Sequence, residues 1–436
     1  MFDKIFKLTQ NDTTVRREIV AGIITFLTMS YILAVNPGIL AEAGMDRAAL
    51  FTATCLASIL GTLFMAFIPN LPIAQAPGMG LNSFFAFSVV LGLGYSWQMA
   101  LTAVFIEGII FIALTFFNVR EMIVNSIPKS IKDAIPVGIG LFIALIGMKN
   151  AGIIVSNPNT MVSLGDMANP HIWVALLGLI VTGVLLYKEV PGSILIGIVV
   201  STIFAAILGL VQMPQGGLVS TPPDISPIFL KFEWRHIFTL DMLIVVFTFL
   251  FVNLFDTIGT LLGVASKAGI LDENGTFPQI KKALFADALG TTFGAVLGTS
   301  TVTSYVESAS GVASGGRTGL TSVSTAAMFA IALFLAPLFL MIPASATAPA
   351  LILVGLFMIT SVVNINFGDF SESIPAFLTI VMMPFAFSIA QGIVFGMLSF
   401  VLLKFLSGKF QQISVTMWII FALFVTKLVL EAMHVL

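Results

Sequence analysis

The chain contains 436 residues, of which 58% are hydrophobic and only 9% are charged, and its formal net charge is -2. A soluble globular domain carries roughly 25% charged residues, so this composition excludes a soluble enzyme or a soluble binding domain. Apolar runs of about 20 residues recur along the whole chain, which predicts an all-α polytopic membrane protein rather than a barrel of short alternating strands.

Residues 1–17 form a charged segment ahead of the first apolar run, and we expect this segment to lie in the cytoplasm. It lacks the early apolar region and the small-residue cleavage site of a signal peptide. Phe2, Ile5 and Phe6 alternate with two lysines. This pattern suits a short amphipathic helix that lies on the headgroups of the bilayer.

Breaks at proline, glycine and charged clusters divide the rest of the chain into fourteen predicted spanning segments. The seven segments before the long connection at 212–238 lie at 18–36, 49–68, 73–92, 97–117, 132–149, 171–187 and 191–211. The seven segments after it lie at 239–263, 283–297, 300–316, 319–341, 347–363, 373–388 and 389–406. A further apolar run at 414–433 is either another spanning helix or a helix at the membrane surface.

The positions of the positive charges support this count when the N-terminus is placed in the cytoplasm. Only Arg47, Lys149, Lys231 and Arg235 then fall outside. The charges on the cytoplasmic side are Lys4, Lys7, Arg16, Arg17, Arg120, Lys129, Lys132, Lys188, Lys267, Lys281, Lys282, Arg317, Lys404 and Lys409. Because the positive-inside rule predicts this asymmetry, we expect a multi-pass protein of the cytoplasmic (inner) membrane with a cytoplasmic N-terminus.

Two halves of seven segments require the second half to be inverted relative to the first, an arrangement found in many secondary transporters. The third segment of each half is interrupted. The first of these carries Pro77 and Gly78 before Asn82, and the second is rich in Gly, Ser and Thr around Glu307. Such breaks free backbone groups that need partners, so the pair of interruptions predicts a binding site at the membrane midplane. Close helix packing through small residues is the alternative explanation.

Two acidic residues lie inside segments that we expect to be embedded in the membrane. Asp256 lies in the segment at 239–263, and Glu307 lies in the segment at 300–316. An acid at the centre of a spanning helix costs about 2.5 to 3.5 kcal/mol, so it normally faces a cavity or a partner rather than lipid. These two residues are the first candidates for a substrate and proton site. A structural acid that is hydrogen-bonded near a helix end is the alternative.

Other polar residues are expected to have supporting roles. Glu107 is expected to make a helix–helix hydrogen bond, and Asp287 is expected to stabilise the core at the start of its helix. Asn253, three residues before Asp256, belongs to the same group. Asp369 and Glu372 lie near a predicted helix end and are expected to be solvated.

Four stretches of the chain carry a more specific pattern. They are AQAPGMGLNSFFAF, NLFDTIGTLLGVASKAGILD, ALFADALGTTFGAVLGTSTVTSYVESASGVASGGRTGL and ATAPALILVG. These stretches resemble the AzgA-like purine permeases of the nucleobase:cation symporter, or nucleobase-ascorbate transporter, family. The resemblance covers essentially the whole chain. Within the family, the chain most resembles the bacterial guanine/hypoxanthine permeases.

The resemblance implies fourteen segments in two inverted repeats of seven, divided between a core domain and a gate domain. The core domain would comprise segments 1 to 4 (18–117) and 8 to 11 (239–341). The gate domain would comprise segments 5 to 7 (132–211) and 12 to 14 (347–406), and 407–436 would form an apolar tail. Short antiparallel strands in segments 3 and 10 would face each other, which agrees with the two interruptions.

The resemblance also implies roles for individual residues. Asp256 and Glu307 fall at the positions of the glutamates in segments 8 and 10 of the uracil symporters. Asn82 falls at an asparagine of segment 3 that is thought to be essential in fungal purine relatives. Asn253 is a departure, because purine relatives often carry an aspartate there, and a role of that position in proton coupling is therefore in doubt.

The chemistry of a purine base fits these residues. A purine such as guanine or hypoxanthine is a flat neutral ring with adjacent N–H donors, and a carboxylate can accept from two donors at once. We expect Glu307 to make this contact. The residues expected to complete the substrate site, as hydrogen-bonding groups or as an apolar face for the ring, are Asn82, Thr257, Ser304, Phe84 and Phe85.

Asp256 is expected to carry the coupling proton, because burial disfavours the charged form of a carboxyl group. Movement of one proton through 100 mV is worth about 2.3 kcal/mol, which suffices for roughly fifty-fold accumulation of a neutral substrate. No cofactor is expected besides protons. Cys55 is the only cysteine, which excludes an intrachain disulfide or a cysteine-rich metal site.

Several other functions were weighed against purine uptake. Transport of xanthine or uracil, and anion exchange on the same fold, remain open, although an anion site favours positive charge or bare helix N-termini over two carboxylates. An intramembrane protease is disfavoured because His171, His236 and His434 all lie near segment ends or the terminus. The expected partners are the purine substrate and the lipid bilayer, with a possible homodimer by family analogy and no nucleic acid.

Overall fold

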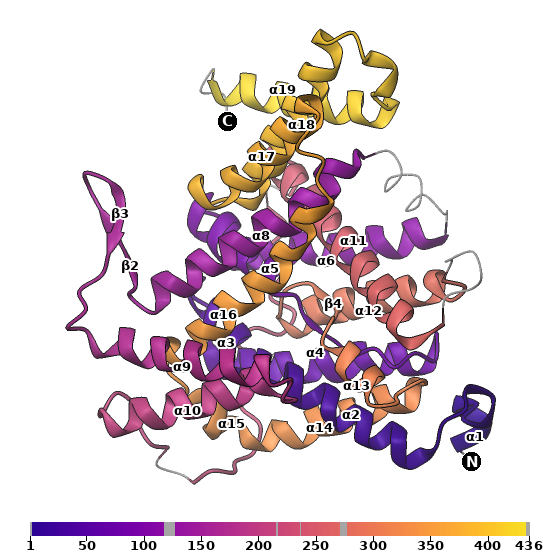
Figure 1. Ribbon diagram of the computed structural model, residues 1–436, viewed down its shortest axis with the longest axis vertical. Coiled ribbons are helices and arrows are strands. Elements are labelled where there is room, and N and C mark those ends of the chain that lie inside the picture. The colour runs from indigo at the N-terminus through magenta and orange to yellow at the C-terminus, as the bar shows by residue number, and fades with distance from the viewer. Residues whose placement is uncertain (1, 117–126, 215–216, 236, 271–276, 433–436) are drawn as a thin grey trace.

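Figure 1 shows the computed structural model of the protein, which describes residues 2–116, 127–214, 217–235, 237–270 and 277–432. Within these residues, nine helical stretches are long and apolar enough to cross a membrane. The predictions that reach residues 1, 117, 215–216, 271–272 and 433–436, and those for Arg120 and His236, lie outside the described residues.

The first half of the chain is helical apart from three short strands. Its elements are α1 (Phe2–Phe6), η1 (Thr9–Asn11), α2 (Val15–Met29), α3 (Ile32–Ala41), α4 (Arg47–Phe67), β1 (Gln75–Pro77), α5 (Met79–Ser83), η2 (Phe84–Gly92), α6 (Trp97–Phe116), α8 (Lys129–Asn150), β2 (Ile154–Asn157), β3 (Met161–Leu164), α9 (Pro170–Tyr187) and α10 (Ser193–Ile207). The first predicted segment is divided, because α2 ends at Met29 and α3 begins only at Ile32.

The second half repeats this pattern of long helices around one short strand. Its elements are α11 (Leu240–Ala268), α12 (Ile280–Leu297), β4 (Val302–Ser304), α13 (Ser308–Ala313), α14 (Gly319–Ala332), η3 (Leu333–Leu335), α15 (Ala336–Leu340), α16 (Ala344–Ile359), η4 (Thr360–Asn364), α17 (Phe370–Phe385), α18 (Ile389–Leu406), η5 (Phe410–Gln412) and α19 (Val415–Ala432). Most predicted segments therefore correspond to a helix or to a unit of strand and helix, whereas those at 18–36 and 319–341 are divided among successive helices. The apolar run predicted at 414–433 forms α19, which packs against α18 at one end of the molecule (Figure 1).

Polar side chains fix where several of the long helices begin. Asp46 caps α4 by accepting from the backbone N–H of Ala49, and Thr239 caps α11 by accepting from the N–H of Met242. Each cap satisfies a backbone donor that has no partner inside the helix. Gly269 ends α11 with a φ of 69°, a left-handed conformation that glycine adopts without a steric penalty.

The interrupted segments meet in the middle of the fold. β1 and β4 pair antiparallel, with Gln75 opposite Ser304 and Pro77 opposite Val302. Helices α5 and α13 follow the two strands. The two halves of the chain thus share one small sheet.

The long helices pack in two groups. One group contains α2, α3, α4, α6, α11, α12, α13 and α14, and the other contains α8, α9, α10, α16, α17 and α18. The most extensive helix contacts fall within these groups, and the contacts between the groups, such as α5 with α8 and α2 with α10, are smaller. The site described below lies where the two groups meet.

An ion pair between buried Lys404 and half-buried Glu372 links elements of the second group, so Glu372, at 26% exposed, is less solvated than expected. Lys404 on α18 is 2% exposed, and its Nζ lies 2.6 Å from Glu372 Oε1 on α17. Lys404 also donates to Gln412 Oε1 at 2.8 Å, and Glu372 accepts from Ser130 Oγ on α8.

Asp369 caps α17 through the N–H of Ser371. The hydrogen bonds from Ser371 hold the pKa of Asp369 at about 2.

Candidate substrate site at the paired strands

A cavity of about 80 Å³ lies beside the ends of β1 and β4. Its walls come from α3, α11, α16 and the two interrupted segments. The residues that line it are Tyr31, Gly78, Met79, Gly80, Asp256, Thr260, Thr303, Ser304, Tyr305, Val306, Glu307, Val354 and Met358.

Backbone contacts between the interrupted segments shape this cavity. The N–H of Gly78 donates to Thr301 O, and the N–H of Tyr305 donates to Ala74 O. Tyr305 Oη donates to Pro77 O at 2.6 Å, which holds the ring across the end of β1. A Cβ atom at Gly78 would lie 2.6 Å from Thr303 Cγ2, so this close approach requires a glycine.

Asp256 and Glu307 both face this cavity. Asp256 comes from the middle of α11, and Glu307 comes from the residue that precedes α13. Tyr31 Oη donates to Glu307 Oε1 at 2.6 Å, a short bond of the charge-assisted kind. Asp256 accepts no hydrogen bond from the described part of the chain. The cavity therefore offers one oriented carboxyl group and one that is unengaged.

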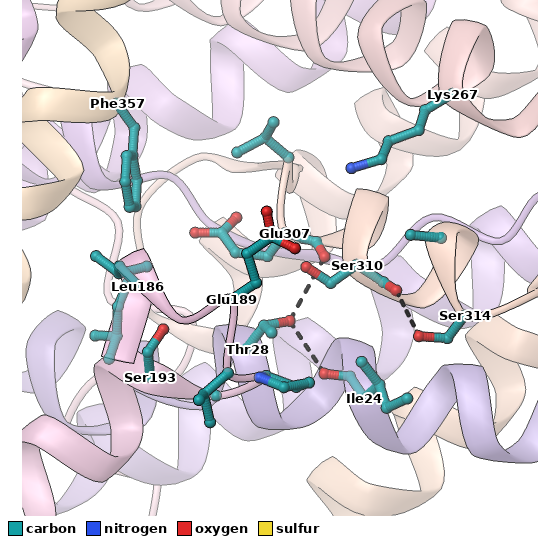
Figure 2. Close-up of a pocket in the computed structure, with 16 residues that line it drawn as sticks. Ile24, Thr28, Leu186, Glu189, Ser193, Lys267, Glu307, Ser310, Ser314 and Phe357 are labelled. Atoms are coloured by element: carbon teal, nitrogen blue, oxygen red, sulfur yellow. Dashed lines mark hydrogen bonds between the residues drawn. The ribbon is translucent and has the colours of Figure 1, made fainter. Parts of the chain in front are cut away.

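Glu307 also borders a larger cleft of about 560 Å³. Figure 2 shows Glu307 between Lys267 on one side and Leu186, Ser193 and Phe357 on the other. Thr28 Oγ1 donates to Ile24 O at 3.1 Å on the floor of the cleft. Lys267 lines the cleft, and Lys188 directly precedes its lining residue Glu189. The charge pattern predicts both lysines to be cytoplasmic.

A hydrogen-bonded polar network lies behind the cavity. Thr257 Oγ1 lies within 3.0 Å of Asn253 Oδ1 and of Asp287 Oδ2, and within 2.9 Å of Thr303 Oγ1. Asp287 Oδ1 also accepts from Gln75 Nε2 at 3.1 Å. This network ties β1, β4, α11 and α12 together, and all of its members are buried.

Glu107 extends the network towards α6. Its two oxygens accept from Asn253 Nδ2 at 2.8 Å and from Thr301 Oγ1 at 2.7 Å. The helix–helix hydrogen bond predicted for Glu107 is present. Since Asn253 donates to Glu107 and accepts at Oδ1, an asparagine fits this position in a way that a third acid next to Glu107 would not.

The structure brings some of the predicted substrate residues to the cavity and leaves others behind it. Asp256, Ser304 and Glu307 line the cavity. Thr257 lies in the network. Asn82 is fully buried, where its Oδ1 accepts from Ser300 Oγ.

The two predicted ring-stacking residues also lie away from the cavity. Phe84 and Phe85 are fully buried and pack against Phe249, with ring centroids 4.8 and 6.5 Å apart. In this conformation no part of either ring lines the cavity. Contact of these residues with a substrate stays a prediction.

Sequence reasoning missed Tyr31, Tyr305, Thr260 and Met358. A signal was present for the tyrosines, since the chain has only four, and Tyr31 and Tyr305 fall well inside predicted segments whereas Tyr187 falls at the end of one. A buried tyrosine hydroxyl needs a partner, so each of these residues marks a polar neighbour. Thr260 and Met358 carry no comparable signal.

Comparison with known proteins identifies the family of the chain. A model of the Permease family matches residues 16–395. The chain belongs to this permease family. The permease is 44% identical over 434 residues to the adenine permease AdeP of Escherichia coli (strain K12), a match that covers 100% of this chain and 97% of the relative.

Two further relatives match over almost their whole lengths. The permease is 44% identical over 432 residues to the guanine/hypoxanthine permease PbuG of Bacillus subtilis (strain 168), covering 96% of this chain and 98% of that one. It is 47% identical over 427 residues to a putative permease of Methanocaldococcus jannaschii, covering 98% of each chain.

Solved structures confirm the predicted fold class. The transmembrane domain of the cyanobacterium bicarbonate transporter BicA superposes with a TM-score of 0.63 at 16% identity, covering 86% of this chain and 97% of that chain. SLC26A9 superposes with a TM-score of 0.63 at 13% identity, covering 90% and 66%. At these identities the likeness concerns the fold alone, which is a polytopic all-α transporter fold with a core and a gate.

Proposed function

We propose that this permease takes up purine nucleobases across the cytoplasmic membrane by proton-coupled alternating access. Guanine and hypoxanthine are the first candidates, and adenine is a further one. The observation that carries the proposal is the pair of carboxyl groups, Asp256 and Glu307, beside the paired strands at the junction of the two helix groups. The names of the relatives AdeP and PbuG support the purine class.

The cavity offers hydrogen-bonding groups that match the edge of a purine. Tyr31 occupies Oε1 of Glu307, so Oε2 remains to accept a ring N–H. Thr260 and the backbone N–H groups at the start of α5 are donors for a ring oxygen or nitrogen. A neutral planar base of this kind requires no cation in the site.

The size of the cavity bears on when the substrate enters. A volume of about 80 Å³ is smaller than the roughly 300 Å³ at which ligand pockets begin. The adjoining cleft of about 560 Å³ supplies the missing space, and Glu307 forms the wall between them. We assign the described conformation to the stage of the transport cycle in which the substrate leaves through this cleft.

Asp256 is the proposed proton carrier. Its carboxyl group has no donor in the described part of the chain and faces the same cavity as Glu307. Two charged carboxylates in one small cavity repel each other, so a proton on Asp256 favours substrate binding at Glu307. Proton and substrate binding are linked in this way without direct contact.

Alternating access requires that the two helix groups move against each other. Gly80 on α5 packs so closely against Ile139 on α8 that a Cβ atom there would lie 2.8 Å from Ile139 Cγ2. This contact joins the segment that carries the cavity wall to the opposite group. Because Gly80 has no side chain that could interlock with α8, this contact favours sliding of the two helix groups against each other.

The test is uptake of radiolabelled hypoxanthine, guanine and adenine into cells that lack their own purine permeases, at acidic and alkaline external pH. Wild type is compared with Glu307→Gln and Asp256→Asn. Asp166→Asn is the matched control, because it also neutralises a carboxylate, on an exposed loop before α9.

We expect wild-type uptake to collapse with an uncoupler, Glu307→Gln to lose substrate binding and Asp256→Asn to lose uphill accumulation. Full acid-driven accumulation by Asp256→Asn would refute the proton role. If well-expressed wild type takes up none of the three purines, the substrate must be sought among uracil, xanthine and anions.

A further inference from the structure

A second cavity, which we call the N-terminal basic cavity, lies apart from the substrate site. Its volume is about 300 Å³, within the range of small-ligand pockets. Its walls come from α1 and η1, the connection between α4 and β1, the ends of α11 and α12, and Arg317 just before α14. In Figure 1, α1 lies at a corner of the molecule beside the helices of the first group.

Three cations converge on this cavity. Lys7, Lys282 and Arg317 line it, and no acidic side chain is among its described lining residues. Neither lysine forms an ion pair within the described part of the chain. Three like charges around one partly open cavity repel one another, and a bound anion would reduce that repulsion.

Arg317 is held in place through one nitrogen of its guanidinium group, and its other N–H donors remain available. Its Nη1 donates to Val312 O at 2.8 Å and to Gly316 O at 2.7 Å. No described protein atom accepts from its Nε or Nη2. A guanidinium fixed at one nitrogen presents its other donors in a rigid fork that matches phosphate oxygens.

The acid that accepts from the backbone of Arg317 is already engaged elsewhere. Glu18 accepts from the backbone N–H of Arg317, and from both the N–H and Oγ1 of Thr318 and Thr321. These five bonds join α2 to the start of α14. Glu18 therefore does not serve as the counter-ion of the cavity, and it does not line it.

Apolar side chains also line this mostly polar cavity, next to the short helix α1. Ile5, Ile68 and Ile270 line the cavity beside its cations. Phe6 anchors α1 through a ring contact with Phe67 at 6.0 Å. Phe2 on the same helix is 49% exposed, as expected for a short helix that rests at the level of the headgroups.

We propose that the N-terminal basic cavity binds a phosphate-bearing anion, carried either by an anionic phospholipid headgroup or by a free phosphate ester. Lys7, Lys282 and Arg317 hold the phosphate, and the isoleucines contact the group attached to it. The site also touches the substrate machinery at two points along the chain. Leu71 on its wall leads into β1, and Arg317 follows the segment that carries Glu307. An occupied cavity thus fixes the ends of both interrupted segments.

The test compares two double variants that remove the same charge. Lys7→Gln/Lys282→Gln removes two cations from the cavity, whereas Lys4→Gln/Lys281→Gln removes two exposed neighbours that do not line it. The full-length protein is extracted from vesicles of phosphatidylcholine with about one-fifth phosphatidylglycerol, and retained phosphatidylglycerol is counted by native mass spectrometry. In a second arm, the shift of the unfolding midpoint is measured in phosphatidylcholine nanodiscs with inorganic phosphate or guanosine monophosphate, against chloride at equal ionic strength.

We expect the cavity variant to weaken binding by about tenfold or more in one arm, with less than about twofold change in the control variant. Loss confined to phosphatidylglycerol identifies a lipid headgroup, and loss confined to the soluble probes identifies a free phosphate. Equal loss in both variants would show diffuse surface electrostatics and overturn the proposal. Failure of wild type to bind any probe would also overturn it. Neither arm measures transport, so the outcome is independent of the purine proposal.

Discussion

The first helix group contains two sets of acidic residues at membrane depth, and they differ in what surrounds them. Glu107 and Asp287 each accept at least two hydrogen bonds from buried side chains. Asp256 and Glu307 line a cavity instead, and Tyr31 is the single side chain that donates to the pair in the described residues.

This difference separates structure from function among buried acids. An acid whose oxygens are all engaged holds helices together, because removing it leaves its donors unpaired. An acid with free acceptor capacity beside a cavity has that capacity available for a ligand or a proton. Depth in the membrane alone does not distinguish the two sets.

The largest expected effect is on folding, from Glu107→Ala. This truncation leaves the amide of Asn253 and the hydroxyl of Thr301 buried without their acceptor, at a cost of about 1–3 kcal/mol for each group. The unfolding midpoint in detergent should fall by several degrees, or the protein should fail to accumulate. Glu307→Ala is the matched truncation; it leaves only the hydroxyl of Tyr31 without its acceptor, so it should lower the midpoint by less. Equal midpoints for the two variants would erase the distinction between the two sets.

The next effect is on binding, from Glu307→Gln. The amide offers one neutral acceptor oxygen, for which Tyr31 and the purine N–H compete, so the charge-assisted bond to the purine is lost or becomes a neutral one. Hypoxanthine affinity, measured by competition for radiolabelled uptake, should fall by about ten- to hundredfold. Glu107→Gln changes charge in the same way inside the network and should alter affinity little. A comparable loss in both variants would assign substrate recognition to the whole core.

A smaller effect is expected from Tyr31→Phe. It removes the hydroxyl that orients Glu307 Oε1 and leaves the ring in place. Affinity should fall by about three- to tenfold, with expression and midpoint preserved. Tyr305→Phe removes a hydroxyl that donates to Pro77 O, so it should lower the midpoint instead. The reverse outcome would exchange the roles that we give to the two tyrosines.

The smallest effect is expected from Asp287→Asn. The side-chain oxygen retained by asparagine can accept from Gln75 and Ser304, and its amide can donate to Thr257 Oγ1. Stability should change by about 1 kcal/mol or less, as judged from thermal unfolding, and uptake should persist. Loss of pH-driven uptake in this variant would move the proton role from Asp256 to Asp287.

The interruptions and the buried acids were predictable because both break the apolar pattern. Pro77 and Gly78 mark β1, and the small residues around Glu307 mark β4 and α13. The division of the acids was expected, with Asp256 and Glu307 at the site and Glu107 and Asp287 in supporting roles. Their hydrogen-bond donors were not predictable, because these donors are distant in the chain. Tyr31 lies 276 residues from Glu307, and Gln75 lies 212 residues from Asp287. The local sequence around Glu307 and Asp287 carries no trace of these partners.

The positions of the phenylalanines were equally hidden. The chain has 40 of them, so Phe84 and Phe85 could not be told apart from ordinary packing residues by type. Only the three-dimensional contact with Phe249 shows what they touch. Composition limits what can be inferred about any one member of so abundant a class.

The shared sheet has a consequence for how the protein is made. Gln75 emerges from the ribosome early, and its partner Ser304 is synthesised 229 residues later. Until then the backbone of β1 has no sheet partner, in a bilayer that supplies none. The inserted first half of the chain therefore lacks the sheet partner of β1 until the second half has been synthesised. A chain truncated before residue 302 presents that unpaired strand to the proteases that clear the membrane of incomplete products.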